Sequence, residues 1–173
     1  ASLQKYGCNA LGLSGADANA IQAHKRIVKD IDYGFAGDVD AVNAASITTF
    51  LKGNMTPVFC AITHDAKGQL LNTNADTIAA SVAAGMSELY EVSLLYTFEK
   101  NGVLRSIEDE DSVIENIQTD SYSTLKEAGV IADGMLPKLE NCFDALQKGV
   151  AEVLIGNPSI ISDKSQKYTT LTL

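Results

Sequence analysis

Apolar residues along this chain gather in two kinds of segment, and the two kinds alternate from one end to the other. Short apolar runs bounded by glycine, proline or polar residues are typical of strands buried in a sheet. Longer segments with apolar residues three or four positions apart are typical of helices that cover a sheet. The pattern predicts strands at 8–13, 57–62, 90–98, 153–155 and 168–173, and helices at 42–51, 74–86, 119–128 and 136–148.

Two further segments near the start, 20–27 and 34–39, are predicted to form a hairpin because Gly34 and Gly37 mark turns. Strands that alternate with helices are typical of an α/β protein, since parallel strands need long, usually helical, connections. The sequence therefore predicts an α/β fold with a largely parallel sheet between layers of helices.

The charge of the chain excludes two classes of main partner. It has 22 acidic and 13 basic residues, a net charge of −9, whereas nucleic acid and anionic membrane surfaces are bound by basic patches. No apolar run approaches the roughly 20 residues that span a bilayer, and no signal peptide is visible at the start. We therefore expect a cytoplasmic protein with neither nucleic acid nor a membrane as its main partner.

Cysteine and histidine are too sparse and too widely spaced to predict a metal site. Cys8, Cys60 and Cys142 are odd in number and far apart, which favours free thiols over a disulfide framework. Neither His24 nor His64 has the spacing of a metal-ligand pair. The sequence therefore predicts no metal held by the protein itself.

The first candidate site lies at the start of the helix predicted at 74–86. Asn72, Asn74 and Asp76 are short polar residues between a strand and this helix, and ligands of open α/β sheets bind at such strand ends. A simpler interpretation is helix capping, with Asn74 as the cap and Asp76 at the positive end of the dipole. Asn72 is not needed for capping, which leaves it for a ligand.

The second candidate site is the segment 130–138, in which Gly134 opens a helix. The amide groups and the dipole of a helix start can bind an anion such as phosphate. Lys138 lies one turn inside, where the dipole disfavours a cation, so the lysine needs a negative partner. The alternative interpretation is a surface lysine. The standard glycine-rich nucleotide fingerprints, Gly-X-Gly-X-X-Gly and Gly-X-X-X-X-Gly-Lys-Ser/Thr, are absent from the sequence.

These two segments, in this order, resemble the N-acetylglutamate kinase family. Its members carry an Asn-X-Asn-Ala-Asp segment before a helix, here 72–76, and a Gly-Met-Ile/Leu-X-Lys segment at a later helix, here 134–138. Segments 10–15 and 102–104 also match the family. The similarity extends through nearly all of the chain.

The resemblance implies the amino-acid kinase fold, also called carbamate kinase-like, a three-layer αβα sandwich with a mainly parallel sheet. Residues 1–88 would be the remainder of a lobe for the amino-acid substrate, and 89–173 a nucleotide-binding lobe, within one continuous globular unit. The implied reaction is ATP-dependent phosphorylation of the side-chain carboxylate of an N-acylated glutamate in arginine biosynthesis. Mg²⁺ would be carried by the nucleotide, and the protein would be a homodimer or a larger homo-oligomer.

Residue roles carry over from the family by position. Lys138 would neutralise charge on the phosphoryl group in flight, and Asp76 would orient the catalytic lysines. Asn72 would hold the N-acylglutamate substrate, with Asn74 in support. The nucleotide would be lined by residues of two segments, namely Tyr96, Thr97, Gly102, Val103, Leu104, Val130, Ile131, Ala132, Gly134 and Met135.

The chain departs from the family pattern in three places, one of which is the usual Gly-Thr near the C-terminus, where Thr169-Thr170 stands. The family's Lys-X-Gly-Gly strand and its second glycine pair are absent, since no Gly-Gly occurs in the sequence. We therefore expect the chain to be incomplete, with an earlier segment that supplies a second catalytic lysine and a substrate-binding arginine. Residues 96–100, Tyr-Thr-Phe-Glu-Lys, stand in place of the usual Ser/Thr-Asp-Val.

Two other functions stay open at this point. Another member of the superfamily would phosphorylate aspartate, carbamate or a nucleoside monophosphate such as UMP, although the segment 72–76 favours glutamate derivatives. A non-catalytic relative would act as a regulatory or binding subunit, and the absent glycine pairs favour this alternative. The sequence does not distinguish an acetyl from a succinyl group on the glutamate.

Overall fold

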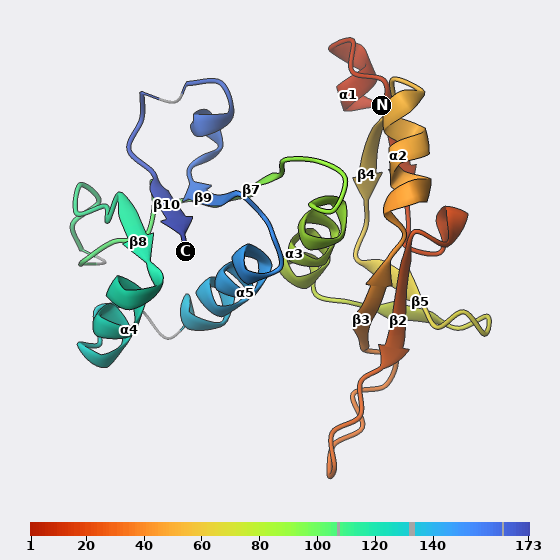
Figure 1. Ribbon diagram of the computed structural model, residues 1–173, viewed down its shortest axis with the longest axis horizontal. Helices are drawn as coiled ribbons and strands as arrows, with labels where there is room; N and C mark the ends of the chain where they lie inside the picture. The colour runs from red at the N-terminus through yellow and green to blue at the C-terminus, as the bar shows by residue number, and fades with distance from the viewer. Residues whose placement is uncertain (107, 132–133, 164) are drawn as a thin grey trace. The chain divides into compact units, whose positions relative to one another are not determined.

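Figure 1 shows a computed structural model of the chain, which describes residues 1–106, 108–131, 134–163 and 165–173. The chain divides into two compact units, Ala1–Leu89 and Tyr90–Leu173. Strands and helices alternate in both units, so the predicted α/β class is confirmed. Among the described residues, every helix is too short or too polar to cross a membrane.

The first unit contains a two-stranded parallel sheet, β1-β4, and a four-stranded sheet of order β3-β2-β5-β6. In the larger sheet β2 and β5 are parallel, whereas the β2–β3 and β5–β6 pairs are antiparallel. The strands are β1 (Ala10–Leu13), β2 (Ile21–Lys25), β3 (Gly37–Val42), β4 (Thr56–Phe59), β5 (Ile62–His64) and β6 (Leu70–Asn72). The helices are α1 (Ser2–Lys5), a 3-10 helix (Asp17–Asn19), α2 (Ala44–Lys52) and α3 (Ala75–Met86).

The strand predicted at 57–62 is wrong in one respect, because it divides into β4 and β5, which belong to different sheets. The Cys60 amide donates to the Leu13 carbonyl at 2.9 Å and so continues the pairing of β4 with β1. One residue later, the Ala61 carbonyl accepts from the Thr73 amide at 3.0 Å. The change of hydrogen-bonding partner breaks the strand, and the apolar pattern alone carries no sign of it.

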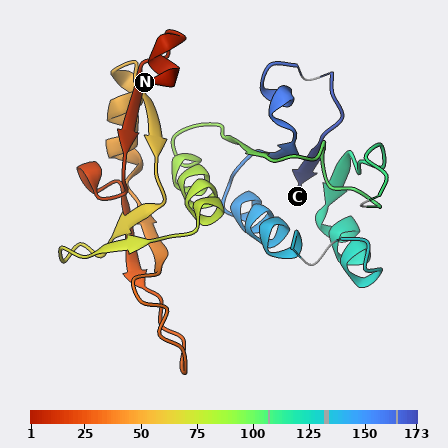
Figure 2. The same cartoon turned by 180° about the vertical axis from the view of Figure 1, so that it is seen from behind.

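The predicted hairpin is confirmed as β2 and β3, with Lys25 opposite Gly37 in the register. The connection between these strands projects away from the rest of the first unit in both views (Figure 1 and Figure 2). A Cβ atom at Gly37 would lie 2.8 Å from Leu71 Cβ and 2.9 Å from Thr73 Oγ1. Real Cβ contacts are not that short, so glycine is required at Gly37 for β3 to approach β6 and the start of α3.

An ion pair joins the two strands where the projecting connection begins. Arg26 Nη2 donates to Asp38 Oδ1 at 2.6 Å, and its Nε donates to both carboxylate oxygens at 3.1 Å. The hydrogen bonds from the Arg26 guanidinium, with its charge, hold the pKa of Asp38 below the ordinary value of 3.8. The side chains are 40% and 38% exposed, so water screens their attraction.

We expect Asp38→Asn to flatten the loss of stability in acid. Because the pKa of Asp38 is lower in the folded chain, the pair stabilises the fold above pH 3.8 and ceases to do so as the pH falls below it. The contribution of such an exposed pair is below about 1 kcal/mol. Urea unfolding at about pH 6 and about pH 3 should show a smaller loss for Asp38→Asn than for wild type. The matched control Asp30→Asn, outside the pair, should follow wild type, and parallel curves for wild type and Asp38→Asn would contradict the expectation.

The second unit is built around a four-stranded sheet of order β7-β9-β10-β8. The β7–β9 and β8–β10 pairs are parallel, and β9–β10 is antiparallel. The strands are β7 (Ser93–Thr97), β8 (Asn116–Gln118), β9 (Glu152–Gly156) and β10 (Thr169–Thr172). The helices are α4 (Thr119–Glu127), α5 (Leu136–Gln147) and a 3-10 helix (Pro158–Ile161).

Helix α5 supplies much of the apolar core of the second unit. Its buried residues are Leu139, Cys142, Phe143, Ala145 and Leu146. They recur at spacings of three and four, which confirms the helical pattern predicted for this segment. The same pattern places Cys142 in the core, where it packs as a small apolar residue.

Candidate functional site

The first predicted site lies where β6 ends and α3 begins. Asn72 is the last residue of β6 and is exposed, and Asn74 is the exposed N-cap residue of α3. Asn74 Oδ1 accepts from the amides of Asp76 at 2.9 Å and Thr77 at 3.2 Å. The side-chain oxygen of Asn74 therefore caps the helix, as the capping interpretation predicts. The side-chain nitrogen of Asn74 is the atom that could donate a hydrogen bond to a substrate. Asp76 is half-buried in the first turn, where the helix dipole favours its charge.

A buried threonine pair, which sequence reasoning missed, holds this segment in place. Thr73 Oγ1 lies 2.8 Å from Thr63 Oγ1 and donates to the Gly37 carbonyl at 3.2 Å. Thr73 is 3% exposed and Thr63 is fully buried. Because Thr73 is anchored between Asn72 and Asn74, the two asparagines are presented on the exposed side of a rigid segment. The alternation of asparagine and threonine in 72–74 was the available signal.

The second predicted site is the start of α5, which begins at Leu136 rather than at Gly134. Gly134 is exposed in the turn before it, and Met135 is the N-cap residue. Met135 makes no capping hydrogen bond with its side chain, and Pro137 in the first turn has no amide hydrogen. The positive end of the α5 dipole favours an anion at this helix start. Ala132 lies outside the described residues.

Two of the predicted site residues, Lys138 and Tyr96, are in contact. The Lys138 ammonium nitrogen lies 5.0 Å from the centroid of the Tyr96 ring. Lys138 is half-buried in the first turn of α5, and Tyr96 is 5% exposed on β7. Lys138 therefore has a defined position, in which the cation lies over an aromatic face.

The other residues predicted to line a nucleotide differ in accessibility. Thr97 at the end of β7 is exposed, whereas Val103 and Ile131 are 3% and 4% exposed. Gly102 is buried too, and a Cβ atom there would lie 2.7 Å from Thr169 Oγ1. Leu104 and Val130 are half-buried. Thr97, Gly134 and Met135 are accessible enough to contact a ligand. The buried residues can only pack beneath those that do.

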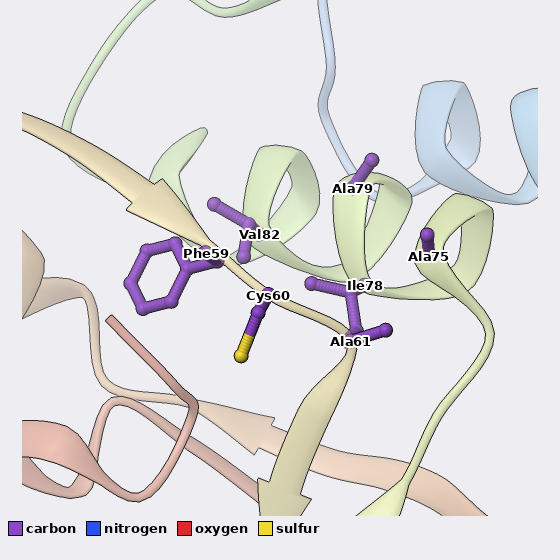
Figure 3. Close-up of a pocket in the computed structure, with 7 residues that line it drawn as sticks. All are labelled: Phe59, Cys60, Ala61, Ala75, Ile78, Ala79 and Val82. Atoms are coloured by element: carbon purple, nitrogen blue, oxygen red, sulfur yellow. The ribbon is translucent and has the colours of Figure 1, made fainter. Parts of the chain in front are cut away.

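A small pocket lies beside the first site, between the end of β4 and helix α3 (Figure 3). Its volume is about 200 Å³. It is lined by Phe59, Cys60, Ala61, Ala75, Ile78, Ala79 and Val82. No lining residue carries a charge, so the pocket does not suit a phosphate or a carboxylate. Within the described ranges, no group of three or more His, Cys, Asp or Glu residues could hold a metal ion.

Sequence comparison identifies the class of protein to which this fold and these two segments belong. Residues 1–157 match the family described as the Amino acid kinase family, and the chain therefore belongs to that family. It is 48% identical over 165 residues to the acetylglutamate kinase of Phocaeicola vulgatus and 50% identical over 163 residues to that of Bacteroides thetaiotaomicron. These matches cover 95% and 94% of this chain but 64% and 63% of the relatives, so the chain spans less than two thirds of their length.

Solved structures confirm the amino-acid kinase fold that the resemblance implied. A protein of Streptococcus mutans has a TM-score of 0.79 at 28% identity and covers 99% of this chain, which covers 64% of it. The N-acetylglutamate synthase of Neisseria gonorrhoeae, complexed with coenzyme A and N-acetyl-glutamate, has a TM-score of 0.76 at 21% identity, and the match covers 93% of this chain and 37% of the synthase. The carbamate kinase of Giardia lamblia has a TM-score of 0.65 at 12% identity, and the match covers 99% of this chain and 65% of the kinase. The last two similarities show the fold alone.

Proposed function

We propose that this chain is part of an enzyme that uses ATP to phosphorylate the side-chain carboxylate of an N-acylated glutamate, as an acetylglutamate kinase does. The observation that carries the proposal is the Lys138 ammonium, held over Tyr96 in the first turn of α5. The positive end of the α5 dipole and an adjacent ammonium together form a positive site, which suits the terminal phosphate of a nucleotide. Similarity to acetylglutamate kinases over most of the chain supports the substrate class.

The chemistry requires positioning and charge neutralisation rather than a protein nucleophile. The substrate carboxylate is ionised near pH 7, and its oxygen forms a bond to the γ-phosphorus of ATP. The bond from that phosphorus to the bridging oxygen breaks, and its electron pair leaves with ADP, so the products are ADP and an acyl phosphate. Mg²⁺, carried by ATP, would supply charge neutralisation that the negative groups need.

The two units would divide this work. In the first unit, Asn72 and the amide nitrogen of Asn74 would bind the N-acylglutamate, since both residues are exposed on an anchored segment. In the second unit, the start of α5 would bind the nucleotide and Lys138 would neutralise the transferring phosphoryl group. Asp76, in the first turn of α3, would orient Lys138. We further propose a cytoplasmic homo-oligomer, as the sequence led us to expect.

The reaction can be tested on the full-length protein. ADP release should be measured with MgATP and each of N-acetylglutamate, N-succinylglutamate and glutamate, with hydroxylamine present to trap an acyl phosphate as a hydroxamate. We expect ADP and hydroxamate in equal amounts with one of the two acylated glutamates. Aspartate, carbamate and UMP test the other kinase activities of the family. No ADP with any glutamate would remove the proposal, and no ADP with any acceptor would favour a non-catalytic relative.

A further inference from the structure

We infer that Tyr96 is a positioning residue for Lys138, and that its ring face fixes the ammonium group at the start of α5. The inference rests on the proposed role of Lys138 in phosphoryl transfer. The face of an aromatic ring carries negative electrostatic potential, and a cation within about 6 Å of the centroid is attracted to it. The observed distance of 5.0 Å lies within that range.

The ring of Tyr96 is held by the sheet on which it lies. Tyr96 is opposite Ile155 in the parallel pairing of β7 and β9, and Ile155 is fully buried. Tyr96 itself is 5% exposed, so its ring is packed on most sides. A ring fixed in this way gives the ammonium a defined position rather than a mobile partner.

The backbone of Lys138 is part of the first turn of α5. Pro137 precedes it in the first turn of α5, and Leu139, which follows it, is fully buried. A lysine has a long four-carbon side chain, which loses rotamer entropy when it is ordered on a ligand. Contact with Tyr96 orders the side chain before the nucleotide arrives, which is preorganisation.

The position of Tyr96 also explains how a lysine is tolerated at this end of a helix. The helix dipole repels a cation in the first turn, and the aromatic face supplies a compensating attraction. Tyr96 begins the segment 96–100 that departs from the family's Ser/Thr-Asp-Val pattern.

The inference can be tested by comparing Tyr96→Phe, which keeps the ring, with Tyr96→Leu, which removes it, in the full-length protein. Lysine labelled with ¹³C at Cε gives a direct readout, because a ring face shifts the Lys138 Cε proton resonances upfield. We expect this shift in wild type and Tyr96→Phe, and its loss in Tyr96→Leu. We also expect Tyr96→Leu to lower kcat about tenfold with KM for ATP and the acylglutamate nearly unchanged, and Tyr96→Phe to stay within about threefold of wild type.

Two results would overturn the inference. One is the absence of an upfield shift at Lys138 in wild type, a measurement that needs neither a variant nor activity. The other is a folded Tyr96→Leu variant with wild-type kcat, and Tyr96→Met serves in its place if the leucine variant does not fold. If wild type shows the shift but no kinase activity with any acceptor, the proposed function fails while the placement of the ammonium by Tyr96 is supported.

Discussion

Lys138→Ala is expected to lower kcat by about 10²- to 10³-fold, the usual effect of removing one preorganised group that stabilises charge in the transition state. Phosphoryl transfer to a carboxylate brings two anions together, and Lys138 is the cation that the structure holds at the start of α5. The free energy of unfolding should change by less than about 1 kcal/mol, because a half-buried lysine in the first turn of a helix adds little to the stability of the fold. Steady-state kinetics and urea unfolding measure the two effects separately.

The matched control is Lys148→Ala, at the other end of the same helix. Lys148 Nζ lies 2.6 Å from Asp144 in an exposed pair four residues apart. Removing such a pair changes stability by only about 0.3–0.5 kcal/mol and should leave kcat within about twofold of wild type. Near-normal turnover of Lys138→Ala would show that the role assigned to Lys138 is wrong.

Thr169→Val should have the largest effect on stability, about 2–4 kcal/mol, although valine has nearly the shape of threonine. Thr169 is fully buried in β10. Its Oγ1 accepts from the Val103 amide at 2.8 Å and donates to the Ile114 carbonyl at 2.7 Å. Valine would leave both main-chain groups without these partners inside the second unit, and an unsatisfied buried group costs about 1–3 kcal/mol. Urea unfolding measures the total effect.

Hydrogen exchange gives a sharper test of the same hydrogen-bond network. The Val103 amide should lose much of its protection in Thr169→Val and keep it in Thr169→Ser, which retains the hydroxyl. Thr170→Val, the same change at a half-buried position of β10, should alter the free energy of unfolding by no more than about 0.5 kcal/mol. Equal stability losses for Thr169→Val and Thr170→Val would contradict a special role for the Thr169 hydroxyl.

Elements with a strong local pattern could be predicted from the sequence. The stripe of α5 repeats its apolar residues at helical spacing, and glycines mark the turns around the β2–β3 hairpin. Local signals also identified the asparagine cap, because Asn74 binds amides only two and three residues away. Each of these signals lies within a few residues of the feature that it predicts.

Elements that depend on a distant partner could not be predicted in the same way. Strand β8 is three residues long with one buried residue, Ile117, and its pairing with β10 is what makes it a strand. The break between β4 and β5 arises because Ala61 pairs with Thr73 while Cys60 pairs with Leu13. Hydrogen-bond partners this far apart leave no periodic trace in the sequence.

The candidate site also has features that local motifs indicate and features that depend on a distant partner. The motifs singled out Asn72, Asp76 and Lys138 as candidates, because the resemblance assigned roles by position. The contact of Lys138 with Tyr96 joins a helix to a strand, and neither segment alone indicates it. The buried Thr63–Thr73 pair is equally hidden, since threonine is common in strands for its shape alone.

A double-mutant cycle of Asp76→Asn and Lys138→Ala, read by kcat, tests most directly the claim that a carboxylate from α3 and an ammonium from α5 act on one phosphoryl group. We expect each single change to lower kcat about 10²-fold or more. We expect the kcat of the double variant to be close to that of the less active single variant, because the effects of groups that act as a unit are strongly non-additive. If the two losses multiply in the double variant, to about 10⁴-fold or more, the two residues act independently and the claim fails.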